Sequence, residues 1–239
     1  MKANDHSQIE MELADTIIDR PKGFSAGRRH FLLYPPTLIT VYLTQRIVKQ
    51  LEIDTDNLKY NPFAEAIRIV HAHKDDVCLL IAYFTLHTKE RCYSKKLLSE
   101  YANYFKSNID DDDLSSLLII CLTWDKTDTI ADYYKINDEL KRMNDLNQVK
   151  EANNTFTFCG KTVYGTIIAA AAEKFGWTYD YIVFGISYAN LSLMLKDCIK
   201  SVYLSDEEAK KAHVNNTSDC IDGNDENAVM AAIMSGKWS

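Results

Sequence analysis

The chain is poor in the residues from which nucleotide-binding loops are built. Only 8 of its 239 residues are glycine. Loops that cradle phosphate need closely spaced glycines, and neither G-x-x-x-x-G-K-[ST] nor G-x-G-x-x-G occurs in the sequence. Gly160-Lys161-Thr162 resembles the end of such a loop, but Thr155 stands where its first glycine is required. We therefore expect a simple turn at this point and no nucleotide cofactor.

Long apolar runs are also absent. The longest stretches, 117–122 and 167–172, are far shorter than the roughly 20 residues that cross a bilayer. The N-terminal segment 1–6 leads into acidic residues and has no apolar run of the signal-peptide type. The sequence thus predicts neither a membrane partner nor export.

The cysteines lack the spacing of a metal or redox motif. There are six, and no two of them form a C-x-x-C pair. Cys78 and Cys121 lie among Leu, Ile and Val, where a free cysteine behaves as a small buried hydrophobe. An even number would allow three disulfides, but the spacing does not favour them. Reduced core thiols in a cytoplasm are the expectation.

No metal site or catalytic group is marked by the local sequence. His71 and His73 precede Asp75 and Asp76, but residues two apart on a helix point to different faces. Both imidazoles would reach one ion only if the helix frayed there. The acidic run 110–113 lacks the glycine and the alternating ligands of a calcium loop and is better explained as a helix cap. We expect no metal, no cofactor and no catalytic residues.

The charge balance argues against a nucleic-acid partner. The formal net charge is −7, whereas nucleic-acid binding usually needs a basic face. The best candidates for a local basic patch are Lys22, Arg28 and Arg29, and the pair Lys95 and Lys96. Solvated side chains are the simpler explanation for these residues.

Apolar periodicity predicts a mainly α fold, a helical bundle with a small N-terminal β-hairpin and a short strand near 155–159. The hairpin is expected between Phe24 and Tyr34, with its turn at Ala26-Gly27. The segment 77–84 is apolar on nearly all sides, which predicts a helix at the centre of the bundle. Other helices are expected over 8–19, 37–51, 61–70, 94–105, 114–124, 128–143, 163–175, 181–184 and 188–203.

Composition also suggests domain boundaries. The segment 144–154 is rich in Asn, Asp and Gln and is interpreted as a linker. We predict a helical domain with the hairpin over 1–150, a C-terminal helical subdomain over 151–204, and an acidic, mobile tail over 205–239.

Aromatic residues gather in one stretch. The chain has 14 tyrosines and 3 tryptophans, and Phe175, Trp177, Tyr179, Tyr181, Phe184 and Tyr188 follow one another closely. Tyr and Trp are favoured at interfaces because they combine a large area with a polar tip. These side chains form either the core of the C-terminal helices or a surface for a partner.

Two stretches resemble a known family. Phe175–Asp197 reads FGWTYDYIVFGISYANLSLMLKD, and Phe31–Leu38 reads FLLYPPTL. The first resembles the C-terminal part of tail assembly chaperones of tailed phages and prophages, with an acidic-aromatic pair, a short helix, a break and a Leu/Met-rich helix. The second is similar to their opening strand, proline and helix. The remainder of the chain matches only in outline.

The resemblance implies a non-enzymatic function in virion morphogenesis. It implies binding to the tape measure protein or to tail tube proteins, in the cytoplasm of a bacterial host. The alternative is a structural subunit of a phage tail, connector or related particle, which would be found in the virion. The residues expected to bind the partner are Trp177, Tyr181, Tyr188, Leu191, Met194 and Leu195.

Overall fold

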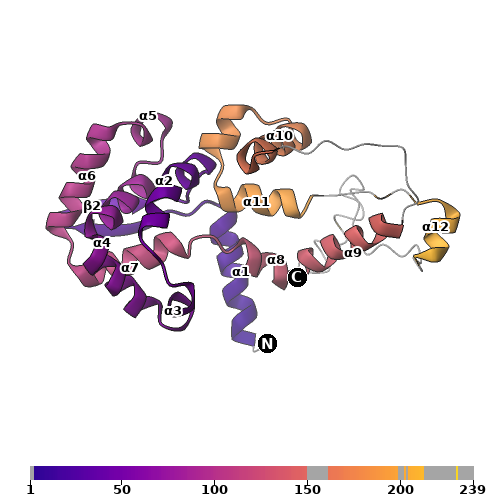
Figure 1. The fold of residues 1–239 in the computed structure, drawn as a ribbon, viewed down its shortest axis with the longest axis horizontal. Helices are drawn as coiled ribbons and strands as arrows, with labels where there is room; N and C mark the ends of the chain where they lie inside the picture. The colour runs from indigo at the N-terminus through magenta and orange to yellow at the C-terminus, as the bar shows by residue number, and fades with distance from the viewer. Residues whose placement is uncertain (1–2, 150–160, 199–201, 203, 213–229, 231–239) are drawn as a thin grey trace. The chain divides into compact units, whose positions relative to one another are not determined.

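The computed structural model describes residues 3–149, 161–198, 202, 204–212 and 230. The fold is mainly α-helical with one two-stranded antiparallel sheet, as the periodicity predicts (Figure 1). The short strand expected near 155–159 lies outside the described residues. Within the part of the chain that is described, no helix has both the length and the apolar character needed to span a bilayer.

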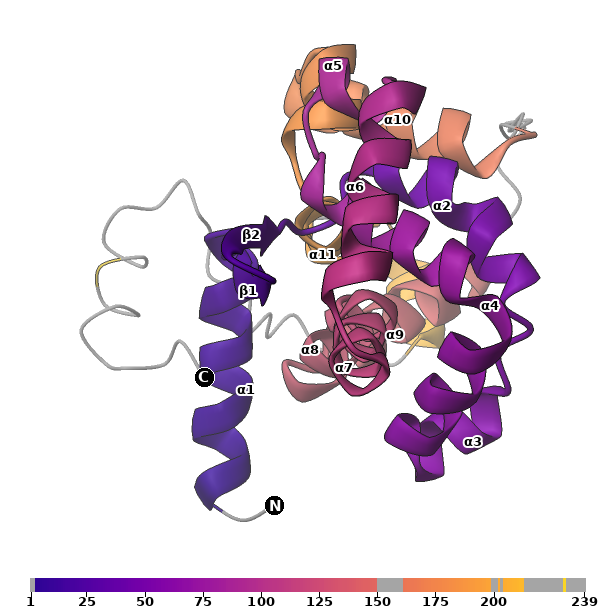
Figure 2. The same cartoon turned by 90° about the vertical axis from the view of Figure 1, so that its left-hand side faces the viewer.

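The N-terminal part contains helix α1 and the predicted hairpin. Helix α1 (Ala3–Ile17) is followed by β1 (Lys22–Ala26) and β2 (Arg29–Leu33). The turn is formed by Gly27 and Arg28, one residue later than expected. Gly27 has a φ of +54°, which favours glycine because other residues meet a steric penalty there. In Figure 2 the hairpin lies above the C-terminal end of α1.

A helical bundle follows the hairpin. Its helices are α2 (Leu38–Gln50), α3 (Thr55–Tyr60), α4 (Pro62–Thr85), α5 (Lys89–Cys92), α6 (Lys95–Asn108) and α7 (Asp111–Leu122). Helix α3 lies where we expected a polar loop, because the Asp54 carboxylate accepts hydrogen bonds from two backbone N–H groups of its first turn. The α7 cap is confirmed, since the Asp110 side chain accepts from the N–H of Asp113.

Helix α4 is the centre of this bundle and packs against α6 and α7 (Figure 2). The two helices expected at 61–70 and 77–84 are one helix with a kink at His73, whose φ is −135° and ψ 39°. Asn61 caps its start by accepting from the N–H of Ala64, and Pro62 occupies the first helical position. The second half buries Val77, Cys78, Leu80, Ile81, Ala82 and Phe84, as predicted for a central helix.

The buried side chains form two clusters. The first cluster is built on α4, with α6, α7, the hairpin and the end of α2 around it. Phe105 is its largest fully buried ring, and it contacts Phe24 and Phe31 with centroid distances of 5.5 and 5.0 Å. The second cluster joins Leu38 of α2 to Ala171, Ile182, Val183, Ile186 and Leu191 of the C-terminal segment.

The C-terminal segment contains α10 (Val163–Phe175), a π-helical turn η1 (Tyr181–Gly185), α11 (Tyr188–Lys196) and α12 (Asp206–Lys211). The predicted stop of α10 at Gly176 is confirmed, because this residue adopts the left-handed conformation with a φ of +65°. Helix α11 is shorter than the expected 188–203. A capping box between Ser205 and Glu208 starts α12 within the segment that we interpreted as a tail.

The expected helix over 128–143 and the linker after it need correction. The structure has two helices, α8 (Thr127–Tyr133) and α9 (Ile136–Val149). They are separated at Lys135, which has a φ of +58°. Helix α9 therefore extends into the first residues of the segment 144–154. Polar residues such as Asn and Gln indicated a linker, but they are also compatible with a solvated helix face.

The described residues fall into two compact units. One comprises 3–130 with 161–197, and it contains both hydrophobic clusters. The other comprises 131–149 and the described residues from 198 onward. The predicted domain division at 150 and 204 stays a prediction.

Phe105→Ala should lower the free energy of unfolding by about 3–5 kcal/mol, because it leaves a cavity where several aromatic rings meet. Tyr60→Ala is the control: Tyr60 is 90% exposed, so its loss should change stability by less than about 0.5 kcal/mol. Urea unfolding followed by circular dichroism measures both. Equal midpoints for the two variants would contradict the assignment of the core.

Candidate functional site

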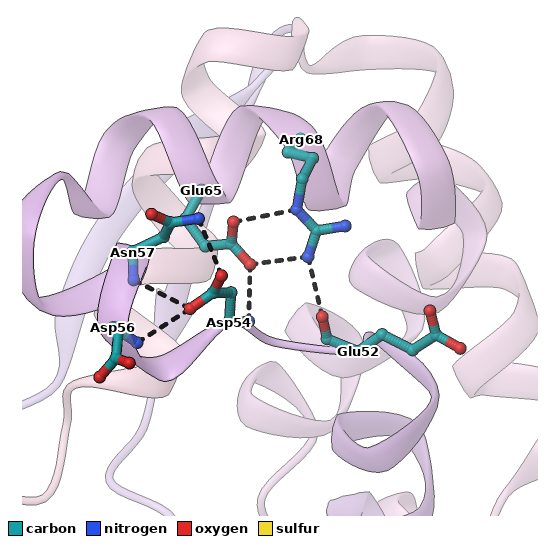
Figure 3. Close-up of polar contacts among 6 residues, drawn as sticks. All are labelled: Glu52, Asp54, Asp56, Asn57, Glu65 and Arg68. Atoms are coloured by element: carbon teal, nitrogen blue, oxygen red, sulfur yellow. Dashed lines mark hydrogen bonds and ion pairs between the residues drawn. The ribbon is translucent and has the colours of Figure 1, made fainter.

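One candidate site is a polar cluster where α2, α3 and α4 meet (Figure 3). The Glu65 side chain is only 1% exposed. Its carboxylate accepts from Nε and Nη2 of Arg68, at 2.9 and 2.7 Å, and from the backbone N–H of Asp54 at 2.8 Å. Arg68 also donates to the carbonyl of Glu52 at 2.8 Å. Both oxygens of the buried carboxylate therefore have partners.

This geometry fixes the connection between α2 and α3. Glu52 has a φ of +46°, an unusual conformation for a residue other than glycine. The Arg68 guanidinium donates to the Glu52 carbonyl, and the Glu65 carboxylate accepts from the backbone N–H of Asp54 at the start of α3. Hydrogen bonding from Arg68 lowers the pKa of Glu65, and burial opposes this shift. Because both oxygens of the buried carboxylate are bonded within the chain, we interpret the cluster as structural.

The buried thiols are also engaged in the core. Burial raises the pKa of Cys78 to about 11, and it raises that of Cys121 further. A thiol is nucleophilic only as the thiolate. Cys78 and Cys121 are therefore protonated at neutral pH, and both contribute apolar surface to the first cluster.

The histidines near the α4 kink have different partners. Nε2 of His71 lies 3.5 Å from the Asp111 carboxylate, whereas Nδ1 of His73 lies 3.9 Å from that of Asp76. Lys74 binds Asp111 as well, at 2.6 Å. Among the described residues, no group of three or more His, Cys, Asp or Glu is arranged to hold a metal ion.

The second candidate site is on the C-terminal segment. Its local structure follows from caps: the Thr162 hydroxyl accepts from the N–H of Gly165, and the Ser187 hydroxyl accepts from that of Asn190. Between the two helices, the N–H of Ile186 donates to the carbonyl of Tyr181, which gives the wide i→i+5 turn of η1. A Cβ on Gly185 would lie 2.6 Å from the Tyr181 ring, so glycine lets this ring pack over the turn.

Three neighbouring aromatic side chains here remain accessible, and we call Trp177, Tyr179 and Tyr181 the aromatic patch. Tyr179 is 61% exposed and Tyr181 is 45% exposed. The Trp177 ring meets that of Tyr181 edge to face at a centroid distance of 5.2 Å, and it also contacts the Phe175 ring at 4.6 Å. Trp177 is half-buried against the second cluster. The patch thus has one ring anchored in the core and two that face solvent.

The remaining predicted site residues lie in different environments. Leu191 is fully buried, so in this structure it packs the second cluster and offers no surface. Tyr188 and Leu195 are half-buried against the same cluster. Met194 is 40% exposed, but it belongs to α11 and not to the turn that carries the aromatic patch. Of the predicted partner-binding residues, Trp177 and Tyr181 are brought together as a ring pair.

Sequence reasoning missed the contribution of α5 to this region. Lys89 forms an ion pair with Asp180 at 2.8 Å and lies 5.0 Å from the centroid of the Phe184 ring. Tyr93, which is 54% exposed, meets the same ring at 6.1 Å. These contacts join residues about ninety positions apart, and no local pattern signals them. They give the aromatic patch a polar and aromatic border.

A small cavity of about 190 Å³ lies elsewhere in the same unit, beside α1 and the end of α7. Its lining includes Asp15, Lys22, Trp124, Lys126 and Ser187. Acidic and basic groups are mixed there, and Lys22 lies over the Trp124 ring at 5.1 Å. We see no single ligand chemistry that this mixture would select.

Comparison with known proteins gives no relative for this chain: no protein-family model, no curated protein and no solved structure matches it.

Because Arg68 lowers the pKa of Glu65, the pair stabilises the fold above the unfolded pKa of 4.5, and this contribution is lost as the pH falls through the lower folded pKa. In Arg68→Met the buried carboxylate has no cation, so its pKa rises. We expect this variant to be less stable at neutral pH and to regain stability on acidification, when Glu65 becomes protonated.

Urea unfolding between about pH 7 and pH 5 measures the effect. The double variant Arg68→Met with Glu65→Gln is the matched control, because it has no carboxylate to protonate and should not regain stability. If the single and double variants show the same pH dependence, the buried carboxylate is not the titrating group.

Proposed function

We propose that the chain is a non-enzymatic phage tail assembly protein, a chaperone that binds the tape measure or tail tube protein through the aromatic patch. The single observation that supports this most is the exposed Tyr181 ring packed edge to face on the anchored Trp177 ring, with Tyr179 exposed two residues earlier. Large exposed aromatic side chains carry much of the binding energy of protein interfaces.

The surroundings of the patch suit an apolar partner. The Lys89–Asp180 ion pair lies at its edge, and a polar rim around an aromatic centre is typical of protein interfaces. The Ser187 cap follows the turn directly, and the buried Ile182 and Val183 pack it on the second cluster. A surface that is already ordered loses little conformational entropy on binding.

The partner that fits best is an amphipathic helix. Such a helix can place an apolar side against the rings, and Met194 supplies an adaptable apolar side chain on the neighbouring helix α11. The net charge of −7 would keep a complex with an apolar partner soluble. These are the properties needed to prevent a long helical protein from aggregating before it is assembled.

Co-expression tests the proposal. A tape measure protein from the same genome should have a higher soluble yield with the wild-type chain than without it. Tyr179→Ser combined with Tyr181→Ser should remove most of this gain, because both substitutions delete exposed rings and leave the second cluster intact. The soluble fraction is measured by quantitative blotting of the clarified lysate.

Tyr42→Ser combined with Tyr60→Ser is the matched control, since these tyrosines are 55% and 90% exposed elsewhere on the surface. It should retain the full effect, and thermal unfolding should confirm that both double variants are folded. Unchanged solubility across the candidate tail proteins would contradict the chaperone function. Recovery of the chain in purified particles would favour a structural tail or connector subunit instead.

A further inference from the structure

The hairpin presents backbone groups that its own two strands do not use. The register pairs Ala26 with Arg29 beside the turn and Phe24 with Phe31 further along. In an antiparallel pair with a two-residue turn these are the hydrogen-bonded pairs, and the alternate residues direct N–H and C=O groups outward. On β2 the outward residues are His30 and Leu32. A sheet edge of this kind is a template for another strand.

This edge is open in the described part of the chain. The outward groups of His30 and Leu32 have no hydrogen-bond partner among the described residues. The outer face is also exposed, and the Leu32 side chain is 42% accessible. Tyr34 follows the same alternation beyond β2, and its N–H already donates to Phe84, so the open part of this edge is His30 and Leu32. On the β1 edge, Pro21 carries no N–H. β2 carries Arg29 and His30 next to the turn residue Arg28, so its edge is the more basic of the two.

The hairpin is held firmly at both ends. The N–H of Gly27 donates to the carbonyl of Asn108, and the N–H of Tyr34 donates to that of Phe84. The Tyr104 hydroxyl donates to the carbonyl of Ala26. With Phe24 and Phe31 packed on α6, the edge has a fixed position and does not need to be ordered by its partner.

The hairpin has the opposite charge to the rest of the chain. Residues 22–33 contain Lys22, Arg28 and Arg29 and no acidic residue, although the whole chain carries −7. Arg29 is held over the Tyr104 ring at 4.7 Å, while Arg28 and His30 are exposed beside the open edge. A second copy would present the same basic edge and would be repelled. Charge complementarity thus selects an acidic partner.

We propose that the open edge of β2 binds an extended acidic segment of a partner protein, which adds a third strand to the hairpin. The strand's backbone pairs with His30 and Leu32, and its carboxylates face Arg28 and Arg29. Such strand addition combines main-chain hydrogen bonds with side-chain selectivity. This site goes beyond the proposed chaperone function and uses none of the residues of the aromatic patch.

Fluorescence anisotropy of the full chain with labelled peptides tests this inference. The probe is a peptide of about eight residues in which Glu and Val alternate, so that it is acidic and prone to form a strand. It should bind, and its binding should weaken as salt is added. The same peptide with N-methyl groups on alternate residues cannot complete the ladder and should bind at least about tenfold more weakly, the loss of roughly one or two hydrogen bonds.

Variants of the protein locate the site. Arg28→Glu combined with Arg29→Glu should weaken binding about tenfold or more through charge repulsion. Lys95→Glu combined with Lys96→Glu is the matched charge reversal at the start of α6 and should have a much smaller effect. Leu32→Pro removes one outward N–H and should abolish the ladder. If that variant does not fold, binding of the normal and N-methylated peptides to the wild-type chain shows whether a strand is added.

Three outcomes would overturn the proposal. Equal binding of the normal and N-methylated peptides would show that no strand is added. Stronger binding of a single-stranded oligothymidylate than of the acidic peptide would assign the basic edge to nucleic acid. Concentration-dependent dimerisation that Leu32→Pro abolishes, without peptide binding by the wild type, would assign the edge to a second copy of the chain.

Discussion

The two hydrophobic clusters depend on how one short segment is anchored. The backbone N–H of Tyr34 donates to the carbonyl of Phe84 at the end of α4, which belongs to the first cluster. Two residues later, the carbonyl of Pro36 accepts from the N–H of Tyr188 at 2.7 Å, and Thr37 forms a bridge with Ser187. Residues 34–37 therefore connect the central helix to the start of α11.

Helix α2 continues this connection. Its first residue, Leu38, is buried in the second cluster, whereas Ile47 near its end is buried in the first. A displacement of α2 would disturb both clusters, so the aromatic patch is positioned by packing that begins in the N-terminal part of the chain. The Glu65–Arg68 pair secures the other end of α2 through the connection to α3.

Much of the fold could be predicted because its signals are local. Asn61-Pro62, Asp110 and Gly176 each mark a helix end through the hydrogen bonds of a few neighbouring residues, and the structure confirms all three. The kink at His73 was harder to predict from the sequence, because the sequence indicated two separate helices. Only packing decides that they remain one continuous helix. No glycine or proline marks the break between α8 and α9 at Lys135.

The candidate site was harder to predict for a similar reason. An aromatic stretch indicates either a core or a surface, and the sequence offers no means of choosing for each ring. Leu191 and Tyr181 were equal candidates, yet one is fully buried and the other is 45% exposed. Burial depends on where α2 and α5 pack, and Lys89 and Tyr93 reach the site from distant positions. Long-range packing therefore separates residues that look equivalent in sequence.

The π-helical turn η1 is wider than an ordinary helical turn. The N–H of Ile186 reaches back five residues to the Tyr181 carbonyl, so the turn holds one residue more than an α-helical turn before the chain becomes extended at Ile186. Loss of a single residue between Tyr181 and Gly185 would remove this wide turn and move the chain before it relative to the start of α11. The rings upstream would then point in a new direction, even though every aromatic residue was still present.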